Sequence, residues 1–423
     1  MRSGALLLIW LHGIFVSTVQ AINLRFPFGA TKVRGVNLGG WLVLEPFVTP
    51  SLFDATGNPA IIDEWTFSAY QSYATAQSAL VRHWETFITE ADFAAIAGAG
   101  LNHVRIPIGY WAFDISKGEP YHQGQFGYLK RAVGWAANHG VKVLIDLHGV
   151  PGSQNGWNHS GRQGPANWAS NSTNLARTRA VLRTLAAEFS QSKYANVVTS
   201  ITPLNEPAPF QNGNILPAAR QYYLDAYGII RNPGGGVKGN LYITYHDAFL
   251  GDWGYWTFLS NKSKFQGISL DTHIYDIFSS GGVKLSYAQH ISGMCARGRQ
   301  IRQWASRNIG VMVGEWTFAP TDCAKYLNGR NNGARYDGSL PGSTYVGSCT
   351  GKSGSGASFS ASYKTFLRKY YEAQTQAWEQ SVGWIHWTWK TEVAADWSYQ
   401  AGLAQGWIPQ NPASRKYDNI CGY

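Results

Sequence analysis

The chain has 423 residues, of which 44% are hydrophobic, enough for a sizeable core in one large domain or two. Its net charge of +10 comes from 35 basic and 25 acidic residues, and the basic ones form no dense run. Only 14% of the residues are charged, so a solvated face or attraction to an acidic extracellular matrix is favoured over nucleic-acid binding. The 18 Trp and 23 Tyr residues supply flat faces suited to sugar rings, although most are expected in the core.

The first 21 residues are typical of a secretory signal peptide. Arg2 precedes an uncharged run from Ala5 to Val16, and Val19 to Ala21 offer small residues near a cleavage point. The apolar run is short for a membrane span, and a retained anchor is the alternative. We therefore expect residues 1–21 to be removed and the protein to be secreted, extracellular or in the cell wall, with no later segment crossing a membrane.

Two further features fit an exported chain. An even set of four cysteines indicates disulfides, with three possible pairings among Cys295, Cys323, Cys349 and Cys421. Three Asn-X-Ser/Thr triplets are candidate glycosylation sites, at Asn158, Asn171 and Asn261.

Strand patterns alternate with helical patterns along the chain. The predicted strands are 31–44 (which runs into a Gly-rich turn), 102–106, 141–147, 197–204, 241–245, 267–270, 309–314 and 382–387. Apolar residues recur at helical spacing over 63–98, 127–139, 175–189, 218–230, 285–307 and 359–379. Within the first of these ranges, a helix is expected to begin near Thr89 and to stop at Gly98 or Gly100. This alternation predicts a parallel α/β fold, and eight strands favour a closed (β/α)8 TIM barrel, with residues 22–423 forming one domain.

Such a barrel gathers the carboxyl ends of all its strands on one face. Glu206 and Glu315 each follow a buried strand pattern, and two glutamates in this setting are the minimum needed for glycoside hydrolysis. A single strand-end glutamate would be interpreted as a surface ion pair, but the matched settings favour chemistry. The polar or aromatic residues expected at this face are Asn37, Arg105, His148, Asn205, Glu206, His273, Tyr275, Glu315 and Trp387.

Six motifs in order carry a family resemblance. They are Arg34–Pro46 (RGVNLGGWLVLEP), His103–Trp111 (HVRIPIGYW), Asp146–Gly156 (DLHGVPGSQNG), Leu204–Pro207 (LNEP), Gly314–Trp316 (GEW) and Trp384–Lys390 (WIHWTWK). Together they span nearly the whole mature chain. The chain therefore resembles the fungal exo-β-1,3-glucanases of glycoside hydrolase family 5.

The resemblance implies a retaining double displacement with Glu315 as nucleophile and Glu206 as acid/base. Glu206 must be protonated in the first step while Glu315 must be ionised, so their surroundings should separate the two pKa values. Tyr275 or Arg105 is expected to hold Glu315 ionised. We predict carboxyl groups about 5–5.5 Å apart, the separation of a retaining pair.

Other side chains are expected to bind substrate. Asn205 is expected to donate to the sugar 2-hydroxyl, Glu45 to grip hydroxyls of the terminal sugar, and Trp387 to lie under the sugar ring. His148 and His273 are also predicted to bind substrate. The alternatives are a structural role for the histidines, core packing for Trp387 and a capping role for Glu45.

Trp157 and Phe278 occupy positions where the family places an aromatic pair at the cleft mouth, with loop packing as the alternative. The sequence departs from the family at Asn158-His159, where the family has Asp-Asn, so recognition of the terminal sugar is expected to differ. Long loops at 149–164 and 323–349 are predicted to block one end of the groove, so that glucose is released from non-reducing ends. An open cleft with internal cleavage is the alternative.

The predicted function is a secreted β-glucosidase acting on β-1,3-glucan. The alternatives are a disaccharide-specific β-glucosidase, such as a rutinosidase acting on flavonoid glycosides, and a wall-binding protein without turnover. No cofactor and no nucleic acid are expected, and no metal is expected because the chain has no His-X-His. We expect a monomer whose partner is a β-glucan or β-glucoside substrate. The predicted disulfides are Cys323–Cys349, closing a local loop, and Cys295–Cys421, tying the C-terminal tail to the barrel.

Overall fold

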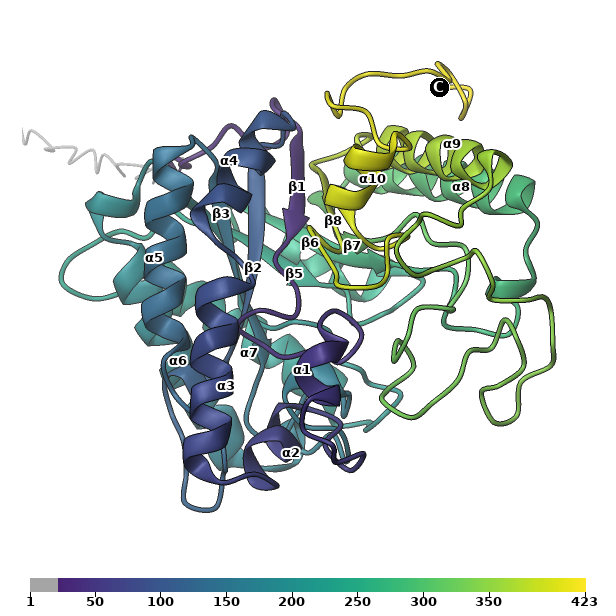
Figure 1. Ribbon diagram of the computed structural model, residues 1–423. Coiled ribbons are helices and arrows are strands. Elements are labelled where there is room, and N and C mark those ends of the chain that lie inside the picture. Colours follow the sequence, from purple (N-terminus) through teal and green to yellow (C-terminus); the bar gives the residue numbers. More distant parts are fainter. Residues whose placement is uncertain (1–21) are drawn as a thin grey trace, which may run out of the picture.

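A computed structural model describes residues 22–423, and its centre is a closed parallel barrel in which each strand pairs with the next and β8 pairs with β1 (Figure 1). The strands are β1 Val33–Asn37, β2 His103–Gly109, β3 Lys142–Gly149, β4 Val198–Thr202, β5 Tyr242–His246, β6 Ile268–Ile274, β7 Gly310–Trp316 and β8 Gly383–His386. The predicted (β/α)8 barrel is confirmed. The signal-peptide prediction for residues 1–21 lies outside the described residues.

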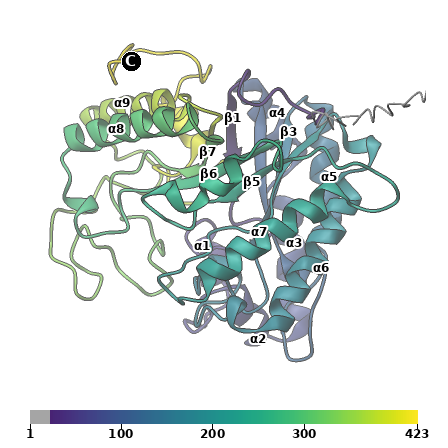
Figure 2. The same cartoon turned by 180° about the vertical axis from the view of Figure 1, so that it is seen from behind.

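Helices surround the barrel on its outer side (Figures 1 and 2). They are α1 Pro50–Asp54, α2 Glu64–Ala69, α3 Tyr73–Thr86, α4 Glu90–Gly98, α5 Gln125–Asn138, α6 Ser172–Phe189, α7 Ile215–Arg231, α8 Tyr287–Ala305, α9 Ala361–Trp378 and α10 Tyr399–Gln405. The helical spacing over 63–98 resolves into three helices because Asp63 and Ser72 each cap a new one, accepting from Thr66 N–H and Thr75 N–H. Within residues 22–423, no helix has both the length and the apolar character needed to cross a membrane.

The strands are buried on both faces, which is why they appear in the sequence as continuous apolar runs. β2 and β6 are buried along their whole length. The barrel interior is not wholly apolar, because Arg105, Asp146 and Asp271 are fully buried within it. These three charged side chains lie below the face on which the predicted site residues gather.

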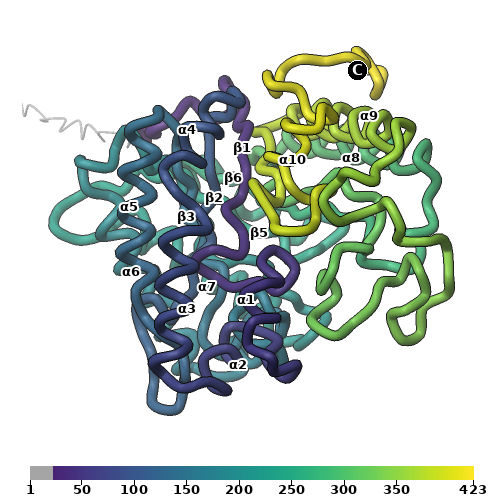
Figure 3. The backbone as a smooth tube through the Cα atoms, viewed as in Figure 1, coloured from purple at the N-terminus to yellow at the C-terminus, as the bar shows by residue number. Residues whose placement is uncertain are grey.

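Both predicted disulfides are present. Cys295–Cys421 joins α8 to the C-terminal tail, and Cys323–Cys349 closes part of the long segment that follows β7. The tail ends beside α8 and α9 (Figure 1). The segment following β7 lies instead at the end of the barrel that also carries α1 and α2 (Figure 3), and Lys325 Nζ contacts Asp54 Oδ2 of α1 at 2.6 Å.

Candidate active site

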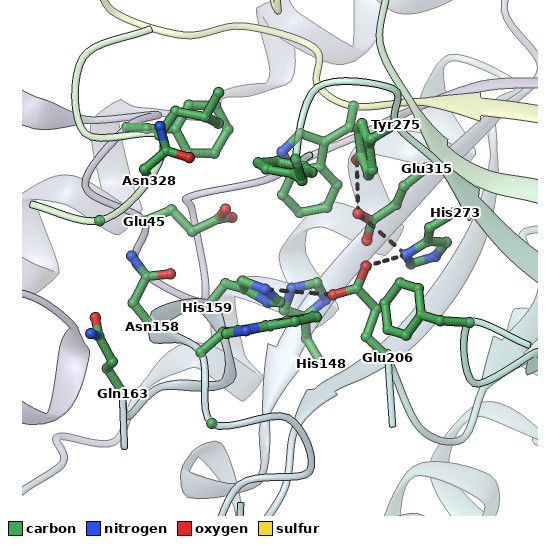
Figure 4. Close-up of a pocket in the computed structure, with 18 of the residues that line it drawn as sticks. Glu45, His148, Asn158, His159, Gln163, Glu206, His273, Tyr275, Glu315 and Asn328 are labelled. Atoms are coloured by element: carbon green, nitrogen blue, oxygen red, sulfur yellow. Dashed lines mark hydrogen bonds and ion pairs between the residues drawn. The ribbon is translucent and has the colours of Figure 1, made fainter. Parts of the chain in front are cut away.

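The strand ends converge on one cavity of about 680 Å³ (Figure 4). Most of the predicted site residues line it: Glu45, His148, Trp157, Glu206, His273, Tyr275, Phe278, Glu315 and Trp387. Arg105 and Asn205 are fully buried and do not line the cavity. Arg105 therefore acts on the neighbouring carboxylates and not on an incoming sugar from the open side.

Glu315 is held by two strong donors. Arg105 Nη1 donates to its Oε1 at 2.8 Å, and the Tyr275 hydroxyl donates to its Oε2 at 2.9 Å. Arg105 also contacts Asp146 Oδ2 at 3.1 Å and donates to Asn205 Oδ1 at 2.7 Å. Charge-assisted bonds of this kind favour the ionised form of a carboxyl group.

Glu206 lies between two imidazoles. His273 Nδ1 is 2.7 Å from its Oε1, and His159 Nε2 is 3.5 Å from its Oε2. The backbone of Glu206 has φ +42°, an uncommon left-handed conformation for a residue with a side chain. Such backbone strain clusters at functional sites, and here it occurs immediately before Pro207, where β4 has ended.

His273 links the two carboxylates, because its Nδ1 is also 3.5 Å from Glu315 Oε2. The distance between Glu206 Oε1 and Glu315 Oε2 therefore cannot exceed the sum of these two distances, 2.7 Å and 3.5 Å. This close approach of the two carboxyl groups to one imidazole nitrogen is compatible with the separation of about 5–5.5 Å in a retaining pair. The spacing fits a retaining pair.

The two carboxyl groups differ in what surrounds them. Burial raises the pKa of Glu206, and the charge of Glu315 raises it further. Burial also raises the pKa of Glu315, but Arg105 and the Tyr275 hydrogen bond oppose the rise. A proton shared by this coupled pair therefore resides on Glu206, as an acid/base and nucleophile pair requires.

His148 and Trp387 form a stacked pair in the cavity. Their rings lie 5.6 Å apart and nearly parallel, at 15°. Asp146 Oδ2, 2.6 Å from His148 Nδ1, fixes the imidazole, so the proton on Nδ1 leaves Nε2 as an acceptor. Asp146 was not predicted as a site residue, yet it contacts both Arg105 and His148.

A polar group lies across the cavity from the two central glutamates: Glu45, Asn158, Gln163 and Asn328 (Figure 4). The backbone N–H of Gly40 donates to Glu45 Oε1 at 2.9 Å, which fixes this carboxylate. Asn158 is part of the cavity lining and Ser160 of its triplet is buried, which disfavours glycosylation at this candidate site. Asn171 and Asn261 are exposed.

The predicted aromatic pair lines the cavity, but its two rings pack in different clusters. Trp157 lies 6.0 Å from Phe210 and 5.7 Å from Phe249, measured between ring centroids. Phe278 lies 5.5 Å from Tyr275. Phe210 and Phe249 were missed, although Phe210 is 65% exposed at the rim.

Three loops are bonded into a wall around the end of the cavity that holds Glu45. Arg330, in the loop after β7, donates to the carbonyl oxygens of Asn58 and Ile61 at 2.7 Å each. Gln163, in the loop after β3, donates its N–H to Asp63 Oδ2 at 2.7 Å. The loop after β1 is therefore hydrogen-bonded to the loops after β3 and β7.

Among residues 22–423, one group of side chains has the spacing of a metal site: Glu206, His246 and His273. Its donor chemistry is poor, because Ala248 N–H donates to His246 Nδ1 at 3.1 Å and so leaves the proton on Nε2. His273 Nδ1 already faces Glu206. We therefore assign no metal to this cluster.

A closed (β/α)8 barrel with two buried glutamates at the ends of β4 and β7 is the architecture of a retaining glycoside hydrolase. The sequence model of Cellulase (glycosyl hydrolase family 5) matches residues 54–331. A glucan 1,3-beta-glucosidase from Blumeria graminis is 45% identical over 404 residues, which cover 95% of this chain and 92% of that protein. A second from Candida oleophila is 42% identical over 416 residues, covering 96% and 95%.

The chain belongs to glycosyl hydrolase family 5. Solved structures share its fold at lower identity. The rutinosidase from Aspergillus niger has a TM-score of 0.68 at 21% identity, covering 92% of this chain and 99% of that one. Endoglucanase Cel5A from Thermotoga maritima has a TM-score of 0.51 at 15% identity, covering 86% and 91%.

Proposed function

We propose that this protein is a retaining β-glucosidase that releases glucose from the non-reducing ends of β-1,3-glucan. The relatives at 42–45% identity that cover almost the whole chain bear the name glucan 1,3-beta-glucosidase. The observation that carries the proposed chemistry is the unequal setting of the two glutamates. Arg105 and Tyr275 donate to Glu315, whereas Glu206 contacts only imidazoles.

In the proposed mechanism Glu315 attacks the anomeric carbon while Glu206 donates its proton to the departing glycosidic oxygen. The C–O bond to the leaving group breaks as the bond to Glu315 forms. Glu206, now ionised, takes a proton from water, which attacks the same carbon and releases Glu315. Two inversions give net retention at the anomeric carbon.

The polar group Glu45, Asn158, Gln163 and Asn328 is proposed to bind the hydroxyls of the terminal sugar. It lies next to the three hydrogen-bonded loops, which we propose to block the glucan chain from extending beyond it at this end. His148 and Trp387 are proposed to contact the same sugar from below. The aromatic rings on the open side of the cavity, Trp157, Phe210, Phe249 and Phe278, are proposed to contact the remaining chain.

Export is part of the proposal. Two disulfides persist only in an oxidising compartment, and residues 1–21 have the pattern of a signal peptide. Cell fractionation with analysis of the mature N-terminus tests this, and protein in the medium or cell wall that begins after Ala21 is the expected result. Protein retained inside the cell contradicts export, and exported protein with an uncleaved N-terminus contradicts the signal peptide.

Parallel digests of laminarin, gentiobiose and rutin test the substrate. Glucose is expected as the first product from laminarin at early time points, with no rutinose from rutin. A ladder of oligosaccharides before glucose contradicts the end-directed mode. Rutinose from rutin without glucose from laminarin contradicts the substrate and favours a disaccharide-specific enzyme.

The wall predicts that Arg330→Ala increases internal cleavage. The variant loses two bonds from a charged donor to carbonyl oxygens, of which that of Ile61 is buried, and each is worth about 2 kcal/mol. Local opening of the loop after β7 should raise the ratio of oligosaccharides to glucose from laminarin and raise the KM for short substrates. Lys325→Ala is the matched control, because it breaks only an exposed ion pair between the same loops. An unchanged product ratio for Arg330→Ala, with the fold intact, contradicts a role for the wall.

A further inference from the structure

Asp271 is a fully buried carboxylate of β6 that none of the roles above uses. Its Oδ1 accepts the backbone N–H of Gly314 at 2.8 Å. Gly314 immediately precedes Glu315 in β7, so this bond fixes the backbone that carries the proposed nucleophile. A side chain at position 314 would place its Cβ 2.2 Å from Asp271 Oδ1, so glycine is needed for this approach.

The other oxygen of Asp271 faces the second glutamate through an imidazole. Asp271 Oδ2 is 3.8 Å from His273 Nε2, a charge contact longer than a hydrogen bond, and His273 Nδ1 is 2.7 Å from Glu206 Oε1. A carboxylate facing Nε2 favours the tautomer with its proton on Nε2. Nδ1 then carries a lone pair and accepts a hydrogen bond from a protonated Glu206.

We propose that Asp271 is a positioning residue for both glutamates. It fixes the backbone of Gly314, and so the position of Glu315, and it favours the His273 tautomer that keeps the proton on Glu206. The proposal rests on the acid/base and nucleophile roles proposed above. Asp271 touches no sugar, because it lies beneath the cavity and is not part of its lining. Its effect is therefore on the protonation of Glu206 and the placement of Glu315.

Asp271 is surrounded by groups from several strands. Burial raises its pKa, whereas Arg105 of β2, His246 of β5 and the N–H of Gly314 oppose the rise and favour its charged form. Its acidic neighbours disfavour that form. The titratable and charged groups whose fields reach Asp271 are Arg105, Asp146, His246, Asp247, His273 and Glu315.

The variant Asp271→Asn reverses the proposed tautomer without changing the shape of the side chain. Gly314 N–H requires an acceptor, so the amide oxygen must stay on that side and the amide NH2 must face His273 Nε2. The positive end of the amide dipole then faces Nε2 and favours the tautomer with its proton on Nδ1, which donates to Glu206 and favours the ionised form of Glu206. The basic limb of kcat/KM should move to lower pH by about one unit.

Aryl β-glucosides measure this effect independently of the natural substrate. With 4-nitrophenyl β-glucoside, which needs protonation of its leaving group, kcat/KM of Asp271→Asn should fall about tenfold more than with 2,4-dinitrophenyl β-glucoside. In the Glu206→Gln background, adding Asp271→Asn should cause no further change of this ratio. Asp92→Asn is the control: it alters a buried carboxylate that binds Lys390, and it should leave the pH profile unchanged.

Two results would overturn the proposal. One is an unshifted basic limb in folded Asp271→Asn together with equal losses on both aryl glucosides, which indicates structural support alone. The other comes from the wild-type protein and does not depend on the folding of a variant. The nitrogen-15 chemical shifts of His273 should show a protonated Nε2 and an unprotonated Nδ1 at the pH of maximal activity. The opposite tautomer would contradict the proposal. If the wild-type protein hydrolyses no β-glucoside at all, that result would instead contradict the proposed function.

Discussion

Replacing Glu315 by Ala is expected to lower kcat on aryl β-glucosides by about 10⁴-fold or more, because the variant has no group to form the glycosyl-enzyme. Added azide should restore part of the turnover by occupying the space of the lost carboxylate. Because azide then attacks the β-glucoside directly, the product should be the α-glucosyl azide. Product analysis by NMR measures both the rescue and the anomer.

Glu379→Gln is the control for this experiment. Its carboxylate binds Arg34 at the start of β1, at the opposite end of the barrel from the cavity. Near wild-type activity is expected for this variant. Retention of more than a few per cent of activity by Glu315→Ala, or a β-glucosyl azide as its product, is incompatible with Glu315 as nucleophile.

Glu206→Ala should lower kcat/KM according to the leaving group. The loss should be about 10²- to 10⁴-fold for substrates that require protonation and small for 2,4-dinitrophenyl β-glucoside, which departs without it. The glycosyl-enzyme then accumulates, and azide should attack it to give the β-glucosyl azide. The two variants therefore give opposite anomers, which assigns the two roles separately.

The pH dependence of kcat/KM tests the acid/base role of Glu206 independently. Burial first, and then the charge of Glu315, raise the pKa of Glu206. Since the acid must be protonated in the free enzyme, kcat/KM of the wild type falls as the pH rises through this pKa, and it falls on the acidic side as Glu315 takes up a proton. Glu206→Ala should lose the basic limb and keep the acidic one. A basic limb that persists in this variant would assign the acid to another group.

The barrel could be predicted because its strands are buried on both faces and most are followed by an α-helix, several of which begin at a side-chain cap, such as Asn171, Ser286 and Ser360. The strand ends then had to share one face, and this brought Glu206 and Glu315 together although they are far apart in the sequence. Two short helices were missed, α1 with 5 residues and α10 with 7. Each is too short for its periodicity to be distinguished from the surrounding loop.

The missed site residues have two physical causes. Asp146 precedes His148 by two positions on β3, so the two side chains face the same way, and this alternation was a usable signal. His159, Asn328 and Phe249 lie in the segments that connect strands to helices, where strand or helix periodicity gives no signal. Phe249, for example, has φ +58° and its N–H donates to Asp247 Oδ1 at 2.9 Å, a local turn that residue type alone does not indicate.

The most direct test of the account is time-resolved proton NMR of the first sugar released from laminarin. The two-glutamate mechanism and the walled cavity together predict free glucose as the first product, initially as the β-anomer, which then mutarotates. Initial α-glucose would contradict the retaining pair Glu206 and Glu315. Oligosaccharides before glucose would contradict the closed end of the cavity.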